Sequence, residues 1–169
     1  MLKLRTRLLV DKLSEFVDFK QCDVLCIGAR DIIEVNYIRS KGAKRVIGID
    51  LYSTDKDIHV MDMHNMMFSD NSFDIVYSSH SLEHSYDIQQ VVNEIIRVAR
   101  PNAYIAIEMP IQFEPRGADL VNIKNIQTLY TLFEPYISQT LWNEEQQSYT
   151  VRNASGTSIL RGIFTLDKT

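Results

Sequence analysis

The sequence predicts an α/β protein in which short buried strands alternate with helices. Two observations support this fold class. Residues 23–28 and 45–50 are continuous apolar runs that end in a glycine or a carboxylate, as strands buried on both faces do. Residues 31–39, which lie between them, carry apolar side chains at helical spacing. Strands that alternate with helices in this way form parallel sheets, so we expect a largely parallel sheet.

The length and charge of the chain limit its class. Its 169 residues suffice for one domain that buries about 70% of its unfolded surface. We therefore expect a single domain over residues 1–169, with an N-terminal helix in residues 1–20 and an α/β core in residues 21–169. The net charge of −4 lacks the basic excess of proteins that wrap nucleic acid, so no nucleic-acid partner is expected.

The N-terminal segment predicts an amphipathic helix. Residues 2–19 place apolar side chains at helical spacing and basic side chains elsewhere on the helix. We expect this helix to lie over a sheet edge or the mouth of the site, although a basic amphipathic segment is also compatible with a membrane surface. No apolar stretch approaches transmembrane length, so we expect no membrane association and a cytoplasmic location.

The two cysteines predict neither a disulfide nor a metal site. Cys22 and Cys26 lie four positions apart in one extended segment, which puts them out of reach of each other for a disulfide. A metal site built on them would need further thiols or histidines at suitable spacing. We expect reduced thiols in or near the core.

The first two predicted strands end in residues suited to a nucleoside ligand. Gly28 closes the first strand, and a helix over residues 31–39 follows, with Gly42 placed to cap it in the left-handed conformation. Asp50 closes the second strand. A glycine at a strand-to-helix turn allows close approach of a ligand, and a carboxylate on the next strand tip can accept hydrogen bonds from both ribose hydroxyls. The alternative is that Asp50 only caps its strand.

Two further strands lead to the middle of the chain. A short apolar segment with Ile58 and Val60 predicts the third strand, which ends at Asp62. Residues 73–79 predict the fourth strand, and a helix is expected from residue 85 or 86 to residue 99. Because proline cannot continue a helix, we expect Pro101 to end it.

The remaining elements complete the predicted sheet. We expect a fifth strand over residues 103–109, a loop over 110–121, a helix over 123–133, and strands over 136–142 and 159–166. The last two strands have no helical crossover between them, so they are expected to pair antiparallel.

The stretch from Met61 to Asp87 resembles the middle of class I S-adenosylmethionine-dependent methyltransferases of the small-molecule type. Three parts carry the resemblance: Asp62, the run Phe73-Asp74-Ile75-Val76, and Leu82-Glu83-His84. The resemblance implies a Rossmann-like, seven-stranded mixed sheet of order 3-2-1-4-5-7-6, with helices on both faces and an antiparallel hairpin at one edge. It also implies that the cofactor is S-adenosylmethionine.

The resemblance further implies which residues bind the cofactor. Asp50 would hold the ribose, while Asp62 would receive the adenine amino group with help from the Met63 N–H. The complete set of expected cofactor-binding residues is Gly28, Ala29, Arg30, Asp31, Asp50, Leu51, Asp62, Met63 and Ser79.

The loop after the first strand departs from the family pattern. That pattern is acidic-x-Gly-x-Gly-x-Gly, whereas the loop Cys26-Ile27-Gly28-Ala29-Arg30-Asp31-Ile32 keeps only the first glycine. In one interpretation Arg30 reaches the cofactor carboxylate and Asp31 its ammonium group. In the other the pocket is partly filled, and the protein is a non-catalytic scaffold or a partner of an active relative. The loop also fails the dinucleotide fingerprint, which disfavours a nicotinamide enzyme.

The histidines supply the catalytic candidates. His59, His64, His80 and His84 fall within 26 residues, but they do not form a H-E-x-x-H motif and they occupy different loops, so no metal is expected. His80 and His84 follow the fourth strand, where the transferred methyl group would lie, and a histidine there can take a proton from the acceptor. The alternative for His84 is a helix-start residue hydrogen-bonded to a backbone carbonyl.

Little of the chain remains to cover an acceptor. The candidates are the loop 110–121, the N-terminal helix and the polar segment 144–157. We therefore expect a compact acceptor, a small molecule or a glycan, or one presented by a partner protein or by the second subunit of a homodimer. The atom that receives the methyl group stays open.

Overall fold

The computed structural model describes residues 4–148 and 157–168. Its elements in chain order are α1 (Leu4–Leu13), β1 (Asp23–Ile27), α2 (Ile32–Ser40), β2 (Arg45–Asp50), β3 (Ile58–Val60), β4 (Phe73–Ser79), a 3₁₀ helix (Leu82–His84), α3 (Ile88–Val98), β5 (Ala99–Ile111), α4 (Ile126–Phe133), β6 (Ile137–Ser148) and β7 (Thr157–Leu166). Strands and helices alternate through β5, as the sequence predicts.

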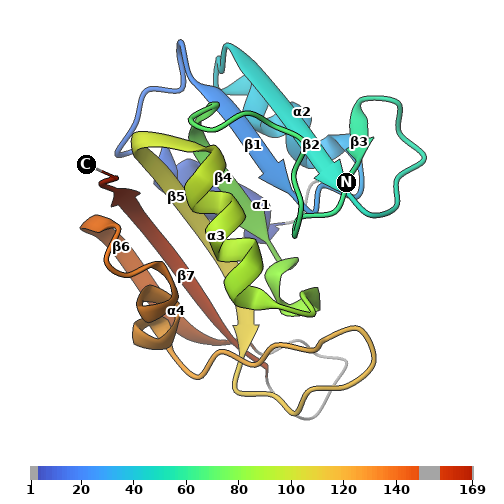
Figure 1. Ribbon diagram of the computed structural model, residues 1–169, viewed down its shortest axis with the longest axis vertical. Helices are drawn as coiled ribbons and strands as arrows, with labels where there is room; N and C mark the ends of the chain where they lie inside the picture. Colours follow the sequence, from blue (N-terminus) through green and yellow to red (C-terminus); the bar gives the residue numbers. More distant parts are fainter. Residues whose placement is uncertain (1–3, 149–156, 169) are drawn as a thin grey trace.

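The strands form one seven-stranded sheet of order β3-β2-β1-β4-β5-β7-β6 (Figure 1). The pairs β3–β2, β2–β1, β1–β4 and β4–β5 are parallel, and β7 pairs antiparallel with both β5 and β6. This is the order implied by the resemblance, so the predicted Rossmann-like mixed sheet is confirmed. The parallel strands bring their carboxyl ends to one edge of the sheet.

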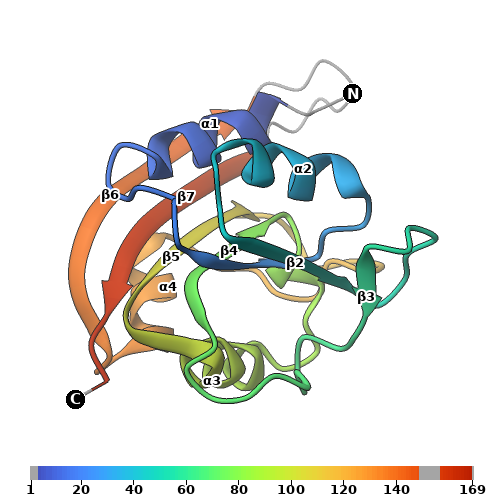
Figure 2. The same cartoon turned by 90° about the horizontal axis from the view of Figure 1, so that it is seen from above.

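Helices cover both faces of the sheet (Figure 2). Seen from above, α1 and α2 lie on one face, and α3 and α4 lie on the other. The two faces correspond to two groups of buried apolar residues, one with Leu9 and Val35, the other with Val92 and Leu129. Asp31 is the N-cap of α2, and its side chain accepts a hydrogen bond from the Ile33 N–H.

Several predicted boundaries are wrong. The N-terminal helix is described over Leu4–Leu13, shorter than the predicted 2–19. The helix expected from residue 85 or 86 begins at Ile88, because Asp87 caps it and the preceding L-E-H residues form a separate 3₁₀ turn. β5 begins at Ala99 instead of residue 103, because the chain turns directly from α3 into the sheet.

The C-terminal hairpin is longer than predicted. β6 continues to Ser148 and β7 starts at Thr157, so residues 144–148 of the expected polar cover belong to a strand. Polar side chains suit β6 because it is the outer strand of the sheet. Residues 149–156 of that expected cover lie outside the described part of the chain.

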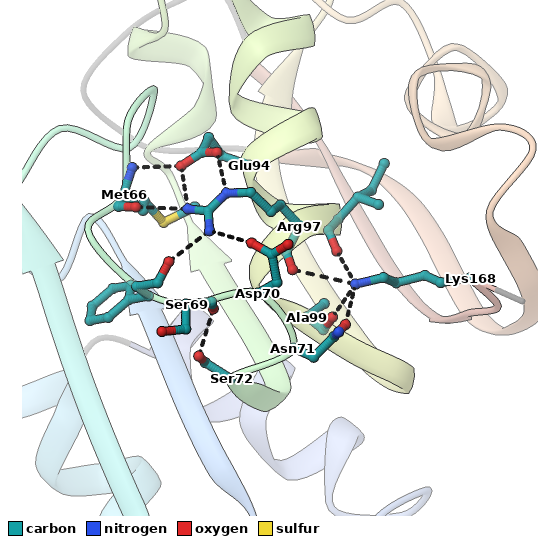
Figure 3. A network of polar contacts seen from close by, with 11 residues as sticks. Met66, Ser69, Asp70, Asn71, Ser72, Glu94, Arg97, Ala99 and Lys168 are labelled. Carbon is teal, nitrogen blue, oxygen red and sulfur yellow. Dashed lines mark hydrogen bonds and ion pairs between the residues drawn. The ribbon is translucent and has the colours of Figure 1, made fainter.

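A polar network fixes α3 to the chain before β4 (Figure 3). The Arg97 guanidinium donates to Glu94 and to the backbone carbonyls of Met66 and Phe68. Lys168 donates to the Ala99 carbonyl at 2.6 Å and to the Ile96 carbonyl at 2.8 Å, at the carboxyl end of α3. The Arg97 bonds anchor the segment that follows β3 and carries Met63, and the Lys168 bonds tie the end of the described chain to α3.

Other sequence expectations concern membranes and thiols. Among the described residues, no helix combines the length and apolar character needed to cross a bilayer. Cys22 and Cys26 are both free thiols, as predicted.

Candidate functional site

A cavity of about 510 Å³ opens where β1, β2 and β4 end. It is lined by Thr6, Ile27, Gly28, Arg30, Asp31, Ile33, Glu34, Ile49, Asp50, Leu51, Tyr52, Met61, Met63, Ser79, His80, Ser81 and His84. Its size falls within the usual range of small-molecule sites, roughly 300–1,000 Å³. Open α/β sheets bind ligands at this edge, where strand order reverses between β1 and β4.

Most of the residues predicted from the sequence line this cavity together. They are Gly28, Arg30, Asp31, Asp50, Leu51, Met63, Ser79, His80 and His84. Ala29 and Asp62 are not among the lining residues. Ala29 is buried, with its side chain in the apolar layer beneath α2.

Gly28 makes the turn from β1 toward α2. Its φ of +75° lies in the left-handed region, and a Cβ built there would lie 1.8 Å from Oγ of Ser81. The Gly28 and Ala29 N–H groups both donate to the Ile49 carbonyl, at 2.8 and 3.1 Å. These two N–H groups are therefore already used within the sheet, and recognition of a ligand here falls to side chains.

Arg30 and Asp31 differ in how far their side chains are already committed. Oδ1 of Asp31 accepts the Ile33 N–H at 3.0 Å, which spends one carboxylate oxygen on the start of α2. The Arg30 side chain is exposed at the cavity wall, and no hydrogen bond or ion pair from it is found within the described residues. The Arg30 guanidinium is therefore available to bind an anion, and one oxygen of Asp31 is available to accept a hydrogen bond.

Asp50 presents a carboxylate at the tip of β2. Oδ1 of Asp50 accepts the Tyr52 N–H at 2.8 Å, which fixes the orientation of the carboxylate. The backbone carbonyl of Asp50 accepts the Met61 N–H at 2.9 Å and so holds the next strand end beside it. Asp50 therefore lines the cavity with Oδ2 not used by the Tyr52 N–H, and this oxygen can accept a hydrogen bond from a ligand hydroxyl.

Asp62 lies beside the cavity wall, where it is bound by its own neighbours. Its Oδ1 accepts the His64 N–H at 2.8 Å and lies 2.6 Å from Nδ1 of the same residue. The His64 ring is buried and stacks on Tyr86 with 3.6 Å between ring centroids. Burial raises the pKa of Asp62, but the hydrogen bonds from His64 lower it more, and the net pKa is below its ordinary value. A short Asx turn accounts for this arrangement.

His80 lies between two buried carboxylates, and its buried Nε2 has no hydrogen-bond partner in the described structure. Its Nε2 lies 3.1 Å from Oε1 of Glu108, and its Nδ1 lies 3.6 Å from Oε1 of Glu83. The backbone is left-handed at His80, with φ of +52°, and its N–H donates to the Glu108 carbonyl at 2.8 Å. Burial raises the pKa of Glu83, whose Oε2 has no hydrogen-bond partner in the described structure.

His84 faces the cavity from the short 3₁₀ helix. Its Nδ1 lies 3.0 Å from the carbonyl oxygen of Ala118 and 3.1 Å from Oδ1 of Asp119. A carbonyl oxygen only accepts, so this contact places the proton on Nδ1 and leaves Nε2 with a lone pair. The sequence offered two interpretations of His84, a contact with a backbone carbonyl and a role as a base. The two are compatible, because the carbonyl contact uses Nδ1 and a base would use Nε2.

Sequence reasoning missed part of the cavity wall. Thr6 on α1 donates to Oε1 of Glu34 at 2.9 Å, and the hydroxyl of Tyr77 donates to the same oxygen at 3.0 Å. Thr6 and Glu34 both line the cavity, and no local sequence signal marks them. Glu108 was also missed, although it is a carboxylate near the end of a buried strand, the signal that identified Asp50.

Comparisons with known proteins agree with this geometry. Residues 25–107 match the family model described as "Methyltransferase domain". Within the described residues, no group of three or more His, Cys, Asp or Glu is arranged to hold a metal ion.

Three solved structures share the fold. A putative sarcosine dimethylglycine methyltransferase from Galdieria sulphuraria is 13% identical, with a TM-score of 0.81 over 98% of this chain and 85% of that one. Burkholderia thailandensis 1,6-didemethyltoxoflavin-N1-methyltransferase, solved with 1,6-didemethyltoxoflavin and S-adenosylhomocysteine, is 15% identical, with a TM-score of 0.74 over 96% and 76%. The [4+2]-cyclase SpnF is 15% identical, with a TM-score of 0.76 over 96% and 81%. At these identities the likeness concerns the fold alone.

Proposed function

Residues 25–107 match the family model of a methyltransferase domain, and from this match we propose that the protein transfers a methyl group from S-adenosylmethionine to a compact acceptor, a small molecule or a glycan. One observation carries the proposal. Gly28, Asp50 and His84 line the same cavity, so a nucleoside-binding edge and a candidate base face one space. Methyl transfer requires the cofactor and the acceptor to be held next to each other, and one shared cavity allows this.

The residues at the β1–β2 end fit the cofactor. Asp50 offers a fixed carboxylate for the ribose hydroxyls, and Met61 and Met63 offer apolar walls for the adenine ring. Arg30 is the free cation suited to the cofactor carboxylate, which it can bind with two parallel hydrogen bonds. Asp31 offers the oxygen not used by Ile33 to the ammonium group. Side chains thus take the place of the missing glycines.

The residues at the β4 end fit the acceptor. The cofactor, when bound, supplies a methyl group already activated by the sulfonium charge. The chain holds the acceptor in line and removes its proton, and we assign proton removal to Nε2 of His84. His80 and Ser79 line the wall beside it.

The loop that follows β5 limits the size of the acceptor. The N–H groups of Leu120 and Val121 donate to the Glu83 carbonyl at 2.8 and 3.0 Å, which ties this loop to the turn that carries His84. A tied loop restricts entry at the acceptor end, and this favours a compact acceptor, bound alone or presented by a partner.

Titration calorimetry with S-adenosylhomocysteine tests the cofactor assignment. We expect wild-type protein and His84→Ala to bind it with similar affinity, and Asp50→Ala to show no measurable binding. Wild-type-like affinity in Asp50→Ala would rule out the assignment of this residue. Methyl transfer is then followed with radiolabelled S-adenosylmethionine over a panel of small amines, alcohols and sugars, in which His84→Ala lowers the rate about 10²-fold.

Thermal unfolding separates the enzyme from the non-catalytic scaffold. A ligand at 100 times its dissociation constant stabilises the folded state by about 2.7 kcal/mol, so S-adenosylhomocysteine should raise Tm and NAD should not. No shift with either compound would favour the scaffold.

A further inference from the structure

A buried ion pair lies directly behind the acceptor end of the cavity. Glu108 on β5 is 0% exposed and Arg161 on β7 is 4% exposed, and the two residues face each other in the antiparallel register of these strands. Nε of Arg161 donates to Oε2 of Glu108. Burying two charges costs free energy, so a pair in this position calls for a role beyond packing.

The pair is part of a longer chain of alternating charges. Nη1 of Arg161 donates to Oε2 of Glu144 at 2.7 Å and to Oε1 of Gln146 at 3.2 Å, both on β6. The other oxygen of Glu108, Oε1, accepts the Ser79 hydroxyl at 3.4 Å and faces Nε2 of His80. The hairpin therefore holds one oxygen of Glu108, and two cavity-lining residues contact the other.

Glu108 approaches His80 at two points. Its backbone carbonyl accepts the His80 N–H at the residue where the chain takes the left-handed conformation, and Oε1 of its carboxylate lies 3.1 Å from the buried Nε2, which has no hydrogen-bond partner in the described structure. Burial raises the pKa of Glu108, but His80 and Arg161 lower it more, so the net pKa lies below its ordinary value and the carboxylate stays ionised. Loss of Arg161 would remove the cation that engages Oε2 of this buried carboxylate.

We propose that Glu108 and Arg161 are positioning residues that fix the imidazole of His80 at the acceptor end of the site proposed above. Arg161 engages Oε2 of Glu108 and is itself oriented by Glu144, so that Oε1 is presented to His80. The β6–β7 hairpin thereby takes part in the active site without lining the cavity. This inference rests on the proposed function for its catalytic consequence only, because the positioning itself is a property of the free protein.

The alternative is an ion pair that only stabilises the sheet. In that case removal of Arg161 lowers Tm but leaves the His80 ring where it is. Positioning predicts that the ring changes its environment even in variants that remain folded.

Nitrogen-15 spectra of protein labelled at histidine distinguish the two roles without any acceptor. The chain has four histidines, and the ring signals of His80 and of His59 are assigned by their loss in His80→Gln and in His59→Gln. We expect Glu108→Gln, which keeps the volume, and Arg161→Met to move the ring signals of His80 and to leave those of the exposed His59 unchanged. Arg161→Lys, which keeps the charge, should return the His80 signals toward wild type.

A matched control comes from the opposite end of the sheet. Arg100 pairs with Asp23 and Asp74 near the start of β1 and β4. Arg100→Met also loses two ion pairs, and we expect it to lower Tm without moving the His80 signals.

Unmoved His80 signals in folded Arg161→Met would overturn the proposal. If Arg161→Met does not fold, Glu144→Gln decides, because it loses the contact that orients Arg161 and does not itself touch His80. With an acceptor in hand, Arg161→Met should lower kcat roughly tenfold or more with less than about a twofold change in the affinity for S-adenosylhomocysteine. An inactive wild-type protein with displaced His80 signals in the variants would refute the proposed function and leave the positioning intact.

Discussion

The carboxylate of Asp119 lies 3.1 Å from Nδ1 of His84, on the side of the ring away from Nε2. The Ala118 carbonyl contacts the same nitrogen at 3.0 Å. Two acceptors at Nδ1 favour the tautomer that leaves Nε2 free to take a proton.

We therefore expect Asp119→Asn to lower the rate of methyl transfer about tenfold. The effect stays below that of His84→Ala because the Ala118 carbonyl still holds Nδ1. Affinity for S-adenosylhomocysteine, measured by calorimetry, should not change. The exposed Asp57 supplies the control, Asp57→Asn, and an equal loss of rate in the control would contradict a specific role for Asp119.

Arg30 can be tested with two ligands that differ by the amino acid part of the cofactor. If Arg30 binds the cofactor carboxylate, Arg30→Ala should lose a charge-assisted bond of about 1.5–3 kcal/mol, which weakens S-adenosylhomocysteine binding tenfold or more. Binding of methylthioadenosine, which lacks that carboxylate, should be unchanged. Equal weakening of both ligands would show that Arg30 acts on the nucleoside or on the fold.

Gly28→Ala should destabilise the protein, because a Cβ at φ of +75° is strained and lies 1.8 Å from Oγ of Ser81. Strain and overpacking together predict a loss of about 2–4 kcal/mol in the free energy of unfolding, measured with urea. The double variant Gly28→Ala with Ser81→Gly removes the clash but keeps the strain. It should recover part of the loss, and no recovery would mean that Ser81 does not set the requirement for glycine.

The Glu94–Arg97 pair predicts a contribution to stability that depends on pH (Figure 3). Hydrogen bonds from Arg97 lower the pKa of Glu94 below its ordinary value of 4.5. A group with a lowered pKa stabilises the fold above its unfolded pKa, and that stability is lost as pH falls through the folded pKa.

The variant Glu94→Gln should therefore cost about 1–3 kcal/mol in the free energy of unfolding at pH 7. The gap between the two proteins should narrow as pH falls below about 4.5. Urea unfolding between pH 3 and pH 7 measures both curves, and a gap that stays constant over this range would exclude the proposed linkage.

Much of the fold follows from local sequence signals. Buried strands with apolar runs, such as residues 23–28, and a helix with a strong apolar stripe, such as α3, were predicted with the right type and order. Boundaries failed where a cap or a turn decides them: Asp87 delays the start of α3, and β5 begins at Ala99, before the left-handed Asn102 and not after it. These boundaries depend on capping hydrogen bonds and turns, which the spacing of apolar residues does not reveal.

A site residue could be predicted from the sequence where a carboxylate directly follows or closes a buried strand. Asp50 was found in this way and does line the cavity. Asp62 follows the same rule, but its carboxylate is engaged by His64, a contact that depends on the fold of the loop. Thr6 on α1 lines the cavity, and Arg161 on β7 contacts Glu108 behind it. Both residues lie far in sequence from β4, and only the tertiary fold brings them near its end.

The placement of β7 between β5 and β6 has a consequence during synthesis on the ribosome. Among the described strands, β6 emerges before β7 but pairs with β7 and not with β5, so this edge of β5 stays unpaired until residue 166 has been translated. At 5–20 residues per second, the 55 residues from 111 to 166 take about 3–11 s. For that interval the nascent chain exposes an unpaired strand edge, the kind of surface that chaperones shield from aggregation.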